Sequence, residues 1–292
     1  MTANLCIAFQ GEMGAYSHEA CRNCYPEMDA LPCRSFEDVI EAVRSGRAGL
    51  AMLPVENSTY GRVADIHHLL PESGLHIIAE TFVRVRVALM ARPGVRLGEV
   101  RHVRAHQVLI PQAKGFLAHH GITSEAAVDS AGAAADLARE DRPGEGVLAS
   151  ELAAEIYGLD VLARDIEDYG HNTTRFLVMS PRPDPERRGE HGMLTSFVFR
   201  VRNIPAALYK AMGGFATNGV NMTKLESYMV NGMFTATQFY ADIEGHPDDA
   251  NVRLALDELG YFTSHLSILG TYPADPLRSQ QAAQYQSLAG GS

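Results

Sequence analysis

Short apolar segments alternate with helical patterns through the first 180 residues, and this alternation constrains the fold more than any other feature of the sequence. Strands are expected at 5–9, 49–55, 82–90, 100–105, 122–128, 146–150 and 160–166, and helices at 62–70, 111–120, 130–140 and 151–157, with two more near Ser17 and after Ser35. Repeated strand–helix units predict sheets of parallel type covered by helices. Because the series restarts after the alternating strand at 82–90, we expect two α/β lobes with a cleft between them.

The pattern changes after residues 181–192, which carry three prolines and many charges and therefore predict a linker. Beyond it we expect a strand at 194–201, a helix at 205–217, strands at 221–229 and 233–243, a helix at 248–260 and a strand at 265–271. The order βαββαβ is the ferredoxin-like arrangement. The predicted organisation is an α/β domain at 1–180, the linker, a ferredoxin-like domain at 193–275, and a tail at 276–292 that is rich in Gln, Ser and Gly and expected to be disordered.

The composition excludes several classes of partner. The formal net charge is −10, so neither a nucleic acid nor an anionic membrane surface would be attracted overall. No apolar run reaches the length that spans a bilayer, and the N-terminus lacks the pattern of a secretory signal, so we expect a cytoplasmic protein. An anionic small molecule would need a local positive site in such an acidic chain.

All four cysteines lie near the N-terminus, at positions 6, 21, 24 and 33. The spacing of Cys21 and Cys24, with Cys33 and His18 nearby, would suit zinc. A second paired ligand motif is missing, and Cys6 and Cys33 have the surroundings of small buried residues in strands. We therefore expect free thiols and no structural metal.

A glycine-rich turn joins the first strand to the first helix. Gly11 and Gly14 precede Ser17, and the free backbone N–H groups of such a turn suit a carboxylate or a phosphate. The spacing is not that of the dinucleotide-binding fingerprint. The alternative is a tight turn in which Ser17 caps the helix.

Polar residues also cluster where two other predicted strands begin or end. Residues 56–58, Glu-Asn-Ser, follow the strand at 49–55, and polar groups at this end of a strand point into the crevice of an α/β sheet. Residues 172–175, Asn-Thr-Thr-Arg, precede an apolar run that starts at residue 176. The second group could fill a turn or face a cleft.

Four segments follow one another in a specific order and spacing: GEMGAYSHEA at 11–20, LPVENS at 53–58, DSAGAA at 129–134 and NTTRF at 172–176. Together they resemble the segments of bacterial prephenate dehydratases that carry a C-terminal ACT regulatory domain. The resemblance covers nearly the whole chain. It implies two catalytic lobes similar to those of periplasmic binding proteins, with prephenate as substrate and neither cofactor nor metal.

The resemblance implies roles for individual residues. Thr174 would be the main catalytic residue, with Glu56, Asn57 and Gln112 in the cleft, and the substrate-binding residues would be Arg175, Phe176, Thr173, Ser17 and Ser58. The reaction expels the ring hydroxyl and CO2 to give phenylpyruvate, so we expect Thr174 to donate a hydrogen bond to the leaving hydroxyl. The family's Ser-His-Pro segment reads Ala105-His106-Gln107, so a hydroxyl expected in the cleft is missing.

Two charged residues have more than one interpretation. Arg175 could anchor a substrate carboxylate bidentately, or it could form an ion pair with Glu167 or Asp168. Glu56 would repel a dianion unless it is protonated or faces away from the substrate.

The βαββαβ part resembles an ACT module through Ala206-Ala-Leu-Tyr-Lys and Thr223-Lys-Leu-Glu-Ser227. This implies feedback by L-phenylalanine, bound where two modules pair, by Ala206, Ala207, Leu208, Asn218, Glu226 and Ser227. We therefore expect a homodimer or a homotetramer. The family's Gly-Ala-Leu reads Ala206-Ala207-Leu208, and its Glu-Ser-Arg-Pro reads Glu226-Ser227-Tyr228-Met229, so the effect of phenylalanine is left open.

Two other functions fit the same features. Arogenate dehydratase acts on a substrate with an amine in place of the keto group, and no feature of the sequence separates the two substrates. A non-catalytic regulator would bind an anionic metabolite between the same lobes. The Thr-Arg-Phe run that starts at Thr174 favours the enzyme.

Overall fold

The computed structural model describes residues 6–140, 142–202, 204–229 and 236–289. The chain forms two compact units: unit 1 comprises 1–63 and 81–176, and unit 2 comprises 64–80 and 177–292. The chain enters unit 2 at residue 64, returns to unit 1 inside strand β5 (His76–Arg84) and leaves again inside strand β11 (Thr173–Ser180). This division differs from the expected boundary at 181–192, because the segment 64–80 packs with the C-terminal part of the chain.

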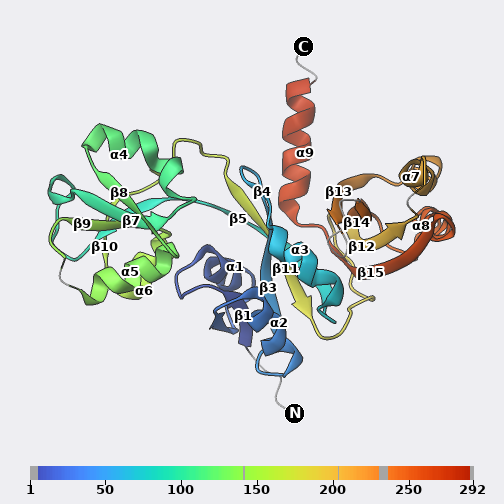
Figure 1. Ribbon diagram of the computed structural model, residues 1–292, viewed down its shortest axis with the longest axis horizontal. Helices are drawn as coiled ribbons and strands as arrows, with labels where there is room; N and C mark the ends of the chain where they lie inside the picture. The colour runs from blue at the N-terminus through green and yellow to red at the C-terminus, as the bar shows by residue number, and fades with distance from the viewer. Residues whose placement is uncertain (1–5, 141, 203, 230–235, 290–292) are drawn as a thin grey trace. The chain divides into compact units, whose positions relative to one another are not determined.

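The first lobe of unit 1 is built on a parallel sheet. Its elements are β1 (Cys6–Gln10), α1 (Tyr16–Cys24), β2 (Asp29–Cys33), α2 (Phe36–Arg44), β3 (Leu50–Asn57) and the short β4 (Gly61–Arg62) (Figure 1). The strand order is β2-β1-β3-β11, and β1 pairs in parallel with β2 and β3. Helix α2 begins after Ser35 as predicted, because the Ser35 side chain accepts a hydrogen bond from the N–H of Asp38 at 3.1 Å.

The second lobe of unit 1 is a five-stranded mixed sheet in the order β10-β6-β9-β7-β8. Its strands are β6 (Ala88–Ala91), β7 (His102–His106), β8 (Thr123–Ala127), β9 (Glu145–Ala149) and β10 (Asp160–Ala163). Its helices are α4 (Lys114–His120), α5 (Ser130–Arg139) and α6 (Glu151–Tyr157), with 3-10 turns η2 (Leu97–Glu99) and η3 (Ile110–Ala113). The expected parallel pairing is confirmed for β7 with β8 and β9, but β6 runs antiparallel to β9 and β10.

The single strand predicted at 82–90 is wrong, because β5 ends at Arg84 and β6 starts at Ala88. Between them the N–H of Val85 donates to the carbonyl of Asn172 at 2.9 Å, and the N–H of Val87 donates to the carboxylate of Glu167 at 3.0 Å. Both acceptors belong to the segment before β11. The backbone is therefore satisfied here without a strand ladder.

Unit 2 contains the βαββαβ order that the sequence predicts. Its elements are β12 (Met193–Val201), α7 (Ala207–Thr217), β13 (Met222–Met229), β14 (Ala236–Glu244), α8 (Ala250–Phe262) and β15 (Thr263–Pro273). The strand order is β13-β14-β12-β15 with antiparallel neighbours. Phe197 of β12, Phe215 of α7 and Leu259 of α8 belong to one buried apolar core.

The segment 64–80 contributes α3 (Ala64–Leu69), the turn η1 (Leu70–Glu72) and the start of β5 to unit 2. Ile77 pairs in parallel with Gly270, where a Cβ would lie 2.1 Å from the Ile77 carbonyl oxygen, so only glycine fits. His67 of α3 also contacts the C-terminal part of unit 2. Its ring is buried and shares a 2.7 Å hydrogen bond with the hydroxyl of Tyr228.

The expectation of a disordered tail is wrong for residues 276–289, which form α9 (Pro276–Ala289). The Asp275 carboxylate accepts a hydrogen bond from the N–H of Leu277 at 2.8 Å at the start of this helix. The Arg278 guanidinium donates to both oxygens of the buried Glu80 carboxylate, at 2.6 and 2.9 Å. These contacts hold the helix start and depend on a residue far away in the sequence.

Candidate active site

A pocket of ≈ 260 Å³ in unit 1 brings together residues from all four segments that carry the resemblance, 11–20, 53–58, 129–134 and 172–176. The turn between Gly11 and Ser17, the stretch 129–131, Thr174 with Phe176, and Pro54 line it. A larger cavity of ≈ 570 Å³ near α1 and α6 is lined mainly by charged side chains and includes none of the hydroxyl residues of these segments. We assign the candidate site to the smaller pocket, because small-molecule sites combine apolar walls with a few placed polar groups.

The glycine turn has a shape that only glycine allows at position 14. Gly14 has φ +92°, and a Cβ there would lie 2.7 Å from the Cα of Ala153. The hydroxyl of Ser150 donates to the Gly14 carbonyl at 2.5 Å. Helix α1 starts at Tyr16, so Ser17 lies in its first turn and the alternative of Ser17 as N-cap is wrong.

Thr174 stands at one end of a chain of three side-chain amides. Asn57 Nδ2 donates to Thr174 Oγ1 at 3.0 Å and to Asn172 Oδ1 at 2.6 Å. Asn172 Nδ2 donates to Gln112 Oε1 at 2.6 Å, and Gln112 Nε2 donates to the carbonyl of Val108 at 2.8 Å. Hydrogen bonds linked in this way polarise one another in a buried setting.

Main-chain groups fix the direction of this amide chain. Asn57 Oδ1 accepts from the N–H groups of Thr59 and Tyr60, both at 2.9 Å, so the Asn57 NH2 group must face Thr174. At the far end a main-chain carbonyl can only accept, so Gln112 must turn its NH2 group toward it. Thr174 Oγ1 therefore accepts from Asn57, and the Thr174 proton is available to an acceptor in the pocket.

The sequence placed Asn172 in a group that could fill a turn or face a cleft, and predicted no role for it individually. It is 3% exposed and bonded at both ends of its amide. Its place at the start of the motif that ends in Phe176 was the one available signal. Asn57 and Gln112 were predicted to lie in the cleft, but neither lines the pocket. Asn57, Asn172 and Gln112 form a connected chain of amides, and Asn57 at its end contacts Thr174.

Arg175 and Glu56 face each other. The Arg175 guanidinium is 3.7 Å from the Glu56 carboxylate, its side chain is 3% exposed, and neither residue lines the pocket. The ion-pair alternative named the wrong partners: Glu167 bonds Arg84 at 3.3 Å, and Asp168 accepts from the N–H of Gly115 at 3.1 Å. The geometry favours the ion pair over carboxylate anchoring, and it places the Glu56 charge against a cation.

Ser58 and Thr173 join the end of β3 to the start of β11. The N–H of Ser58 donates to the Thr173 carbonyl at 2.8 Å, and the N–H of Thr173 donates to Ser58 Oγ at 2.9 Å. The Ser58 hydroxyl donates to the carbonyl of His171 at 3.0 Å. Both residues were expected to bind substrate, but they do not line this pocket. Their contacts hold Thr174 at the pocket wall.

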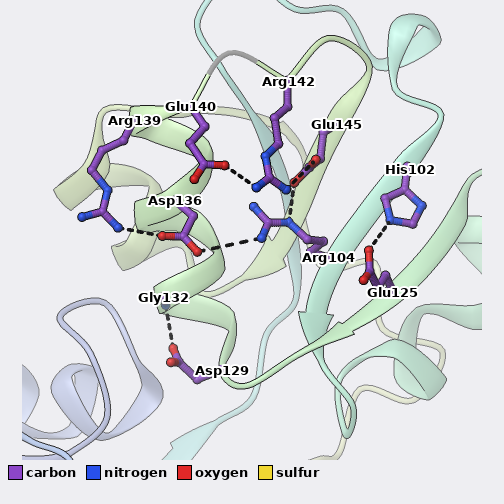
Figure 2. Close-up of polar contacts among 10 residues, drawn as sticks. All are labelled: His102, Arg104, Glu125, Asp129, Gly132, Asp136, Arg139, Glu140, Arg142 and Glu145. Atoms are coloured by element: carbon purple, nitrogen blue, oxygen red, sulfur yellow. Dashed lines mark hydrogen bonds and ion pairs between the residues drawn. The ribbon is translucent and has the colours of Figure 1, made fainter.

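Among the described residues that line the pocket, Asp129 is the only carboxylate and there is no lysine or arginine. Figure 2 shows the Asp129 carboxylate against the N–H of Gly132, at 2.6 Å, at the start of α5. The arginines drawn there pair with carboxylates instead: Arg104 with Asp136 and Glu145, Arg139 with Asp136, and Arg142 with Glu140 and Glu145 (Figure 2). None of these arginines lines the pocket.

Burial shifts the pKa of two titratable groups in or beside the pocket in the direction that favours their neutral forms. Burial, more than any neighbouring charge, raises the pKa of the Tyr16 phenol, which donates to the carbonyl of Arg86 at 2.7 Å. Burial likewise lowers the pKa of His18, whose ring stacks on Phe9 with centroids 5.4 Å apart. His18 Nδ1 accepts from the N–H of Gly14 at 3.0 Å, so Nδ1 is unprotonated and the neutral ring carries its proton on Nε2.

The described residues indicate neither a metal site nor a membrane-spanning helix. Within the described ranges, no three His, Cys, Asp or Glu side chains are grouped to hold a metal ion. Burial raises the pKa of the Cys21 thiol, which disfavours the thiolate that zinc requires. Of the helices in the described part of the chain, none is both long and apolar enough to cross a membrane.

A family model described as prephenate dehydratase matches residues 7–184, which is more than half of the 292 residues. The chain belongs to the prephenate dehydratase family. This family member is 49% identical over 278 residues to a Komagataeibacter europaeus protein named bifunctional N-acyl-homoserine lactone acylase/prephenate dehydratase, with 95% of the chain and 99% of the relative covered. It is 37% identical over 279 residues to arogenate dehydratase/prephenate dehydratase 2, chloroplastic, of Arabidopsis thaliana, covering 92% of the chain and 73% of the relative.

Two solved structures are similar in fold to this chain. A structure described as GqqA, a novel type of quorum quenching acylase, matches with a TM-score of 0.88 and 49% identity, over 94% of the chain and 99% of the other. Prephenate dehydratase from Arthrobacter aurescens in complex with L-Phe matches with a TM-score of 0.84 and 28% identity, over 97% of this chain and 99% of the A. aurescens chain. The comparison covers both units of this family member.

The position where the family has a serine is buried. Ala105 is 0% exposed in β7 and does not line the pocket. The N–H of the next residue, His106, donates to Ser130 Oγ at 2.9 Å. A hydroxyl that lines the pocket, that of Ser130, therefore lies beside this position.

The candidate effector residues lie at both ends of α7 and on β13. Ala206, with φ +62°, precedes the helix, which starts with Ala207 and Leu208, whereas Asn218 follows it and donates to the Glu258 carboxylate at 3.0 Å; Glu226 and Ser227 are on β13. A helix of 11 residues is about 16 Å long, so its two ends do not meet at one small-molecule pocket of a single chain.

Proposed function

We propose that this family member converts prephenate to phenylpyruvate and that Thr174 donates a hydrogen bond to the leaving hydroxyl. The observation that carries the proposal is the Asn57–Thr174 hydrogen bond, because it leaves the threonine proton for another acceptor while Thr174 lines the pocket. Membership of the prephenate dehydratase family supports the substrate.

The reaction places new negative charge on one oxygen. The bond between the ring carbon and the ring carboxylate breaks and CO2 leaves. The electron pair of that bond enters the ring and expels the hydroxyl, which takes up a proton from solvent and departs as water. The ring becomes aromatic, which drives the reaction, and phenylpyruvate keeps the side-chain carboxylate and keto group. A donor aimed at the departing oxygen therefore stabilises the transition state more than the substrate.

A threonine hydroxyl is too weak an acid to give up its proton fully. Thr174 acts instead through a hydrogen bond that strengthens as charge grows on the leaving oxygen. Asn57 donates to the same Oγ1 atom and fixes the direction of its proton. Loss of a donor of this kind costs roughly 100- to 1000-fold in kcat.

The test is incubation of the purified chain with prephenate, with phenylpyruvate detected by its absorbance in alkali. Turnover by the wild-type chain supports the proposal, and wild-type chain without turnover refutes it. Arogenate is tested in parallel, because the A. thaliana relative carries both substrate names. A higher kcat/KM for arogenate than for prephenate would reassign the substrate within the same chemistry.

We do not extend the acylase activity named for the K. europaeus relative to this pocket. Acyl transfer needs a hydroxyl activated by a base. Among the described hydroxyls of the pocket, none contacts an imidazole ring: Ser150 donates to a main-chain carbonyl, and Ser130 accepts from the main chain of His106. Thr123 does contact the His102 ring, at 2.9 Å, but its hydroxyl donates to a main-chain carbonyl, so the ring is the donor.

The proposal includes regulation by unit 2. The βαββαβ part would be an ACT domain that binds L-phenylalanine, supported by its strand order and by the A. aurescens relative solved with L-Phe. Two chains would supply opposite ends of α7 to one effector site, which calls for a homodimer or homotetramer. The lobes of unit 1 would close on substrate as those of periplasmic binding proteins do. A monomer in sedimentation at micromolar concentration would contradict this part.

A further inference from the structure

The pocket presents a charge problem for the proposed substrate, which carries two carboxylates. No lysine or arginine is among the described residues that line it, Arg175 faces Glu56, and Asp129 adds a negative charge. His106 supplies the imidazole there, and its Nδ1 accepts from the N–H of Val108 at 3.3 Å, so that nitrogen carries no proton for the substrate. The whole chain has a formal net charge of −10. With no lysine or arginine in the lining, hydrogen-bond donors and backbone dipoles are the groups there that can balance the substrate's two negative charges.

Two helices begin at the pocket wall. Helix α1 has 9 residues and α5 has 10. Tyr16 and Ser17 of the first turn of α1 line the pocket, as do Ser130 and Ala131 of the first turn of α5. First-turn N–H groups have no partner within their own helix, and a helix N-terminus carries partial positive charge. The Asp129 side chain caps only the N–H of Gly132, which leaves the earlier N–H groups of α5 uncapped by it.

The hydroxyl of Ser17 is the independent observation that points to a ligand. Ser17 is 9% exposed and lines the pocket, and within the described part of the chain its hydroxyl has no hydrogen-bond partner. Buried hydroxyls are normally bonded, so this one is placed for a molecule that the chain itself does not supply. Ser130 is also 9% exposed, and its Oγ accepts from His106, so its proton is available to the pocket as well.

We infer that Ser17 and Ser130, with the first-turn N–H groups of α1 and α5, form the subsite that binds a carboxylate of the substrate. The inference rests on the proposed function. It names the groups that bind the carboxylate in a pocket lined by neither lysine nor arginine. A carboxylate accepts hydrogen bonds at two oxygens. Each lobe supplies one hydroxyl and one helix start, so each lobe can donate to one of the two oxygens. Because α1 belongs to the first lobe and α5 to the second, the bound carboxylate joins the lobes beside Thr174.

The test compares Ser17→Ala and Ser130→Ala with the wild-type chain in steady-state turnover of prephenate. Removing one hydrogen bond to a charged group should raise KM roughly 10-fold or more for each variant. The kcat should change by less than about threefold, because the lost contact is equal in the substrate and the transition state. Ser124→Ala, at an exposed hydroxyl on β8, is the matched control and should keep both constants.

Values of KM within about twofold of wild type for both variants would overturn the subsite. Ser17→Cys keeps nearly the same size with a weak donor, so it should also raise KM if Ser17→Ala does not fold. Calorimetric titration with prephenate separates this inference from the proposed function. Wild-type binding without turnover, weakened in Ser17→Ala, would refute the function and keep the subsite, whereas no binding by the wild-type chain would refute both.

Discussion

Replacing Asn172 by aspartate changes one donor atom in the amide chain behind Thr174. Asn172 Nδ2 donates to Gln112 Oε1 at 2.6 Å, so Asn172→Asp would place two acceptors against each other. Gln112 cannot relieve this by turning round, because its NH2 group is needed by the carbonyl of Val108. One buried polar group is left unsatisfied in either orientation, which costs about 1–3 kcal/mol. Because Asn57 bonds both Asn172 and Thr174, a shift that relieves the unsatisfied group also moves Thr174.

We expect Asn172→Asp to lower kcat roughly 10- to 100-fold near pH 8, less than the full loss of a transition-state donor. KM should stay within about threefold, because Asn172 does not line the pocket. The introduced carboxyl is buried, so its pKa should be raised. In its protonated form it can donate to Gln112 Oε1 as the amide does. The kcat of the variant relative to wild type should therefore recover as the pH falls.

The assay is the alkaline absorbance of phenylpyruvate, with kcat and KM measured for both proteins between pH 5.5 and pH 8.5, values chosen to bracket a raised carboxyl pKa of roughly 6–7. Asn23→Asp, an exposed amide-to-carboxylate change on α1, is the matched control and should leave the kcat ratio at one. A variant-to-wild-type kcat ratio that is independent of pH would refute the reasoning, since a general loss of structure would not be repaired by adding one proton.

Three further changes test the packing that holds these parts. Gly270→Ala should lower the free energy of unfolding by at least about 2 kcal/mol, since a Cβ there would lie 2.1 Å from the Ile77 carbonyl, and urea titration measures it. Arg278→Ala removes the two hydrogen bonds to the buried Glu80 carboxylate and should cost roughly 2–3 kcal/mol, seen as a lower Tm in calorimetry. The pKa of His18 is lowered by burial, so its neutral form is favoured on folding. The stability it contributes is present above the unfolded pKa of about 6.5 and is lost as the pH falls below it, and His18→Gln should flatten this part of the stability–pH curve.

The sequence predicted most elements because their signals are local. The helix at 151–157 was placed correctly because Ser150 caps it, accepting from the N–H of Ala153 at 3.2 Å, and the βαββαβ order followed from periodicity. The strand at 82–90 was wrong because Asn172 and Glu167 supply its hydrogen bonds from far along the chain. No local pattern contains that information.

The sequence indicated which segments form the site and, through the resemblance, which residues act there, but not the contacts between their side chains. Thr174 was selected from the sequence, but its hydrogen bond to Asn57 joins residues 117 positions apart. The roles of Asn172 and Gln112 depend on which amide atom faces which neighbour, and this follows from main-chain groups that only the fold brings close. The ion-pair alternative for Arg175 named Glu167 or Asp168 from the preceding segment, whereas the structure places Glu56, on the adjacent strand, 3.7 Å from its guanidinium.

The central claim is that the Thr174 hydroxyl donates a hydrogen bond that grows in the transition state. The most direct measurement is kcat for prephenate in Thr174→Ala and Thr174→Ser. The account predicts a kcat roughly 100- to 1000-fold lower for Thr174→Ala, with KM little changed, and activity within about tenfold of wild type for Thr174→Ser, which keeps the hydroxyl. A folded Thr174→Ala variant whose kcat stays within about fivefold of wild type would contradict it.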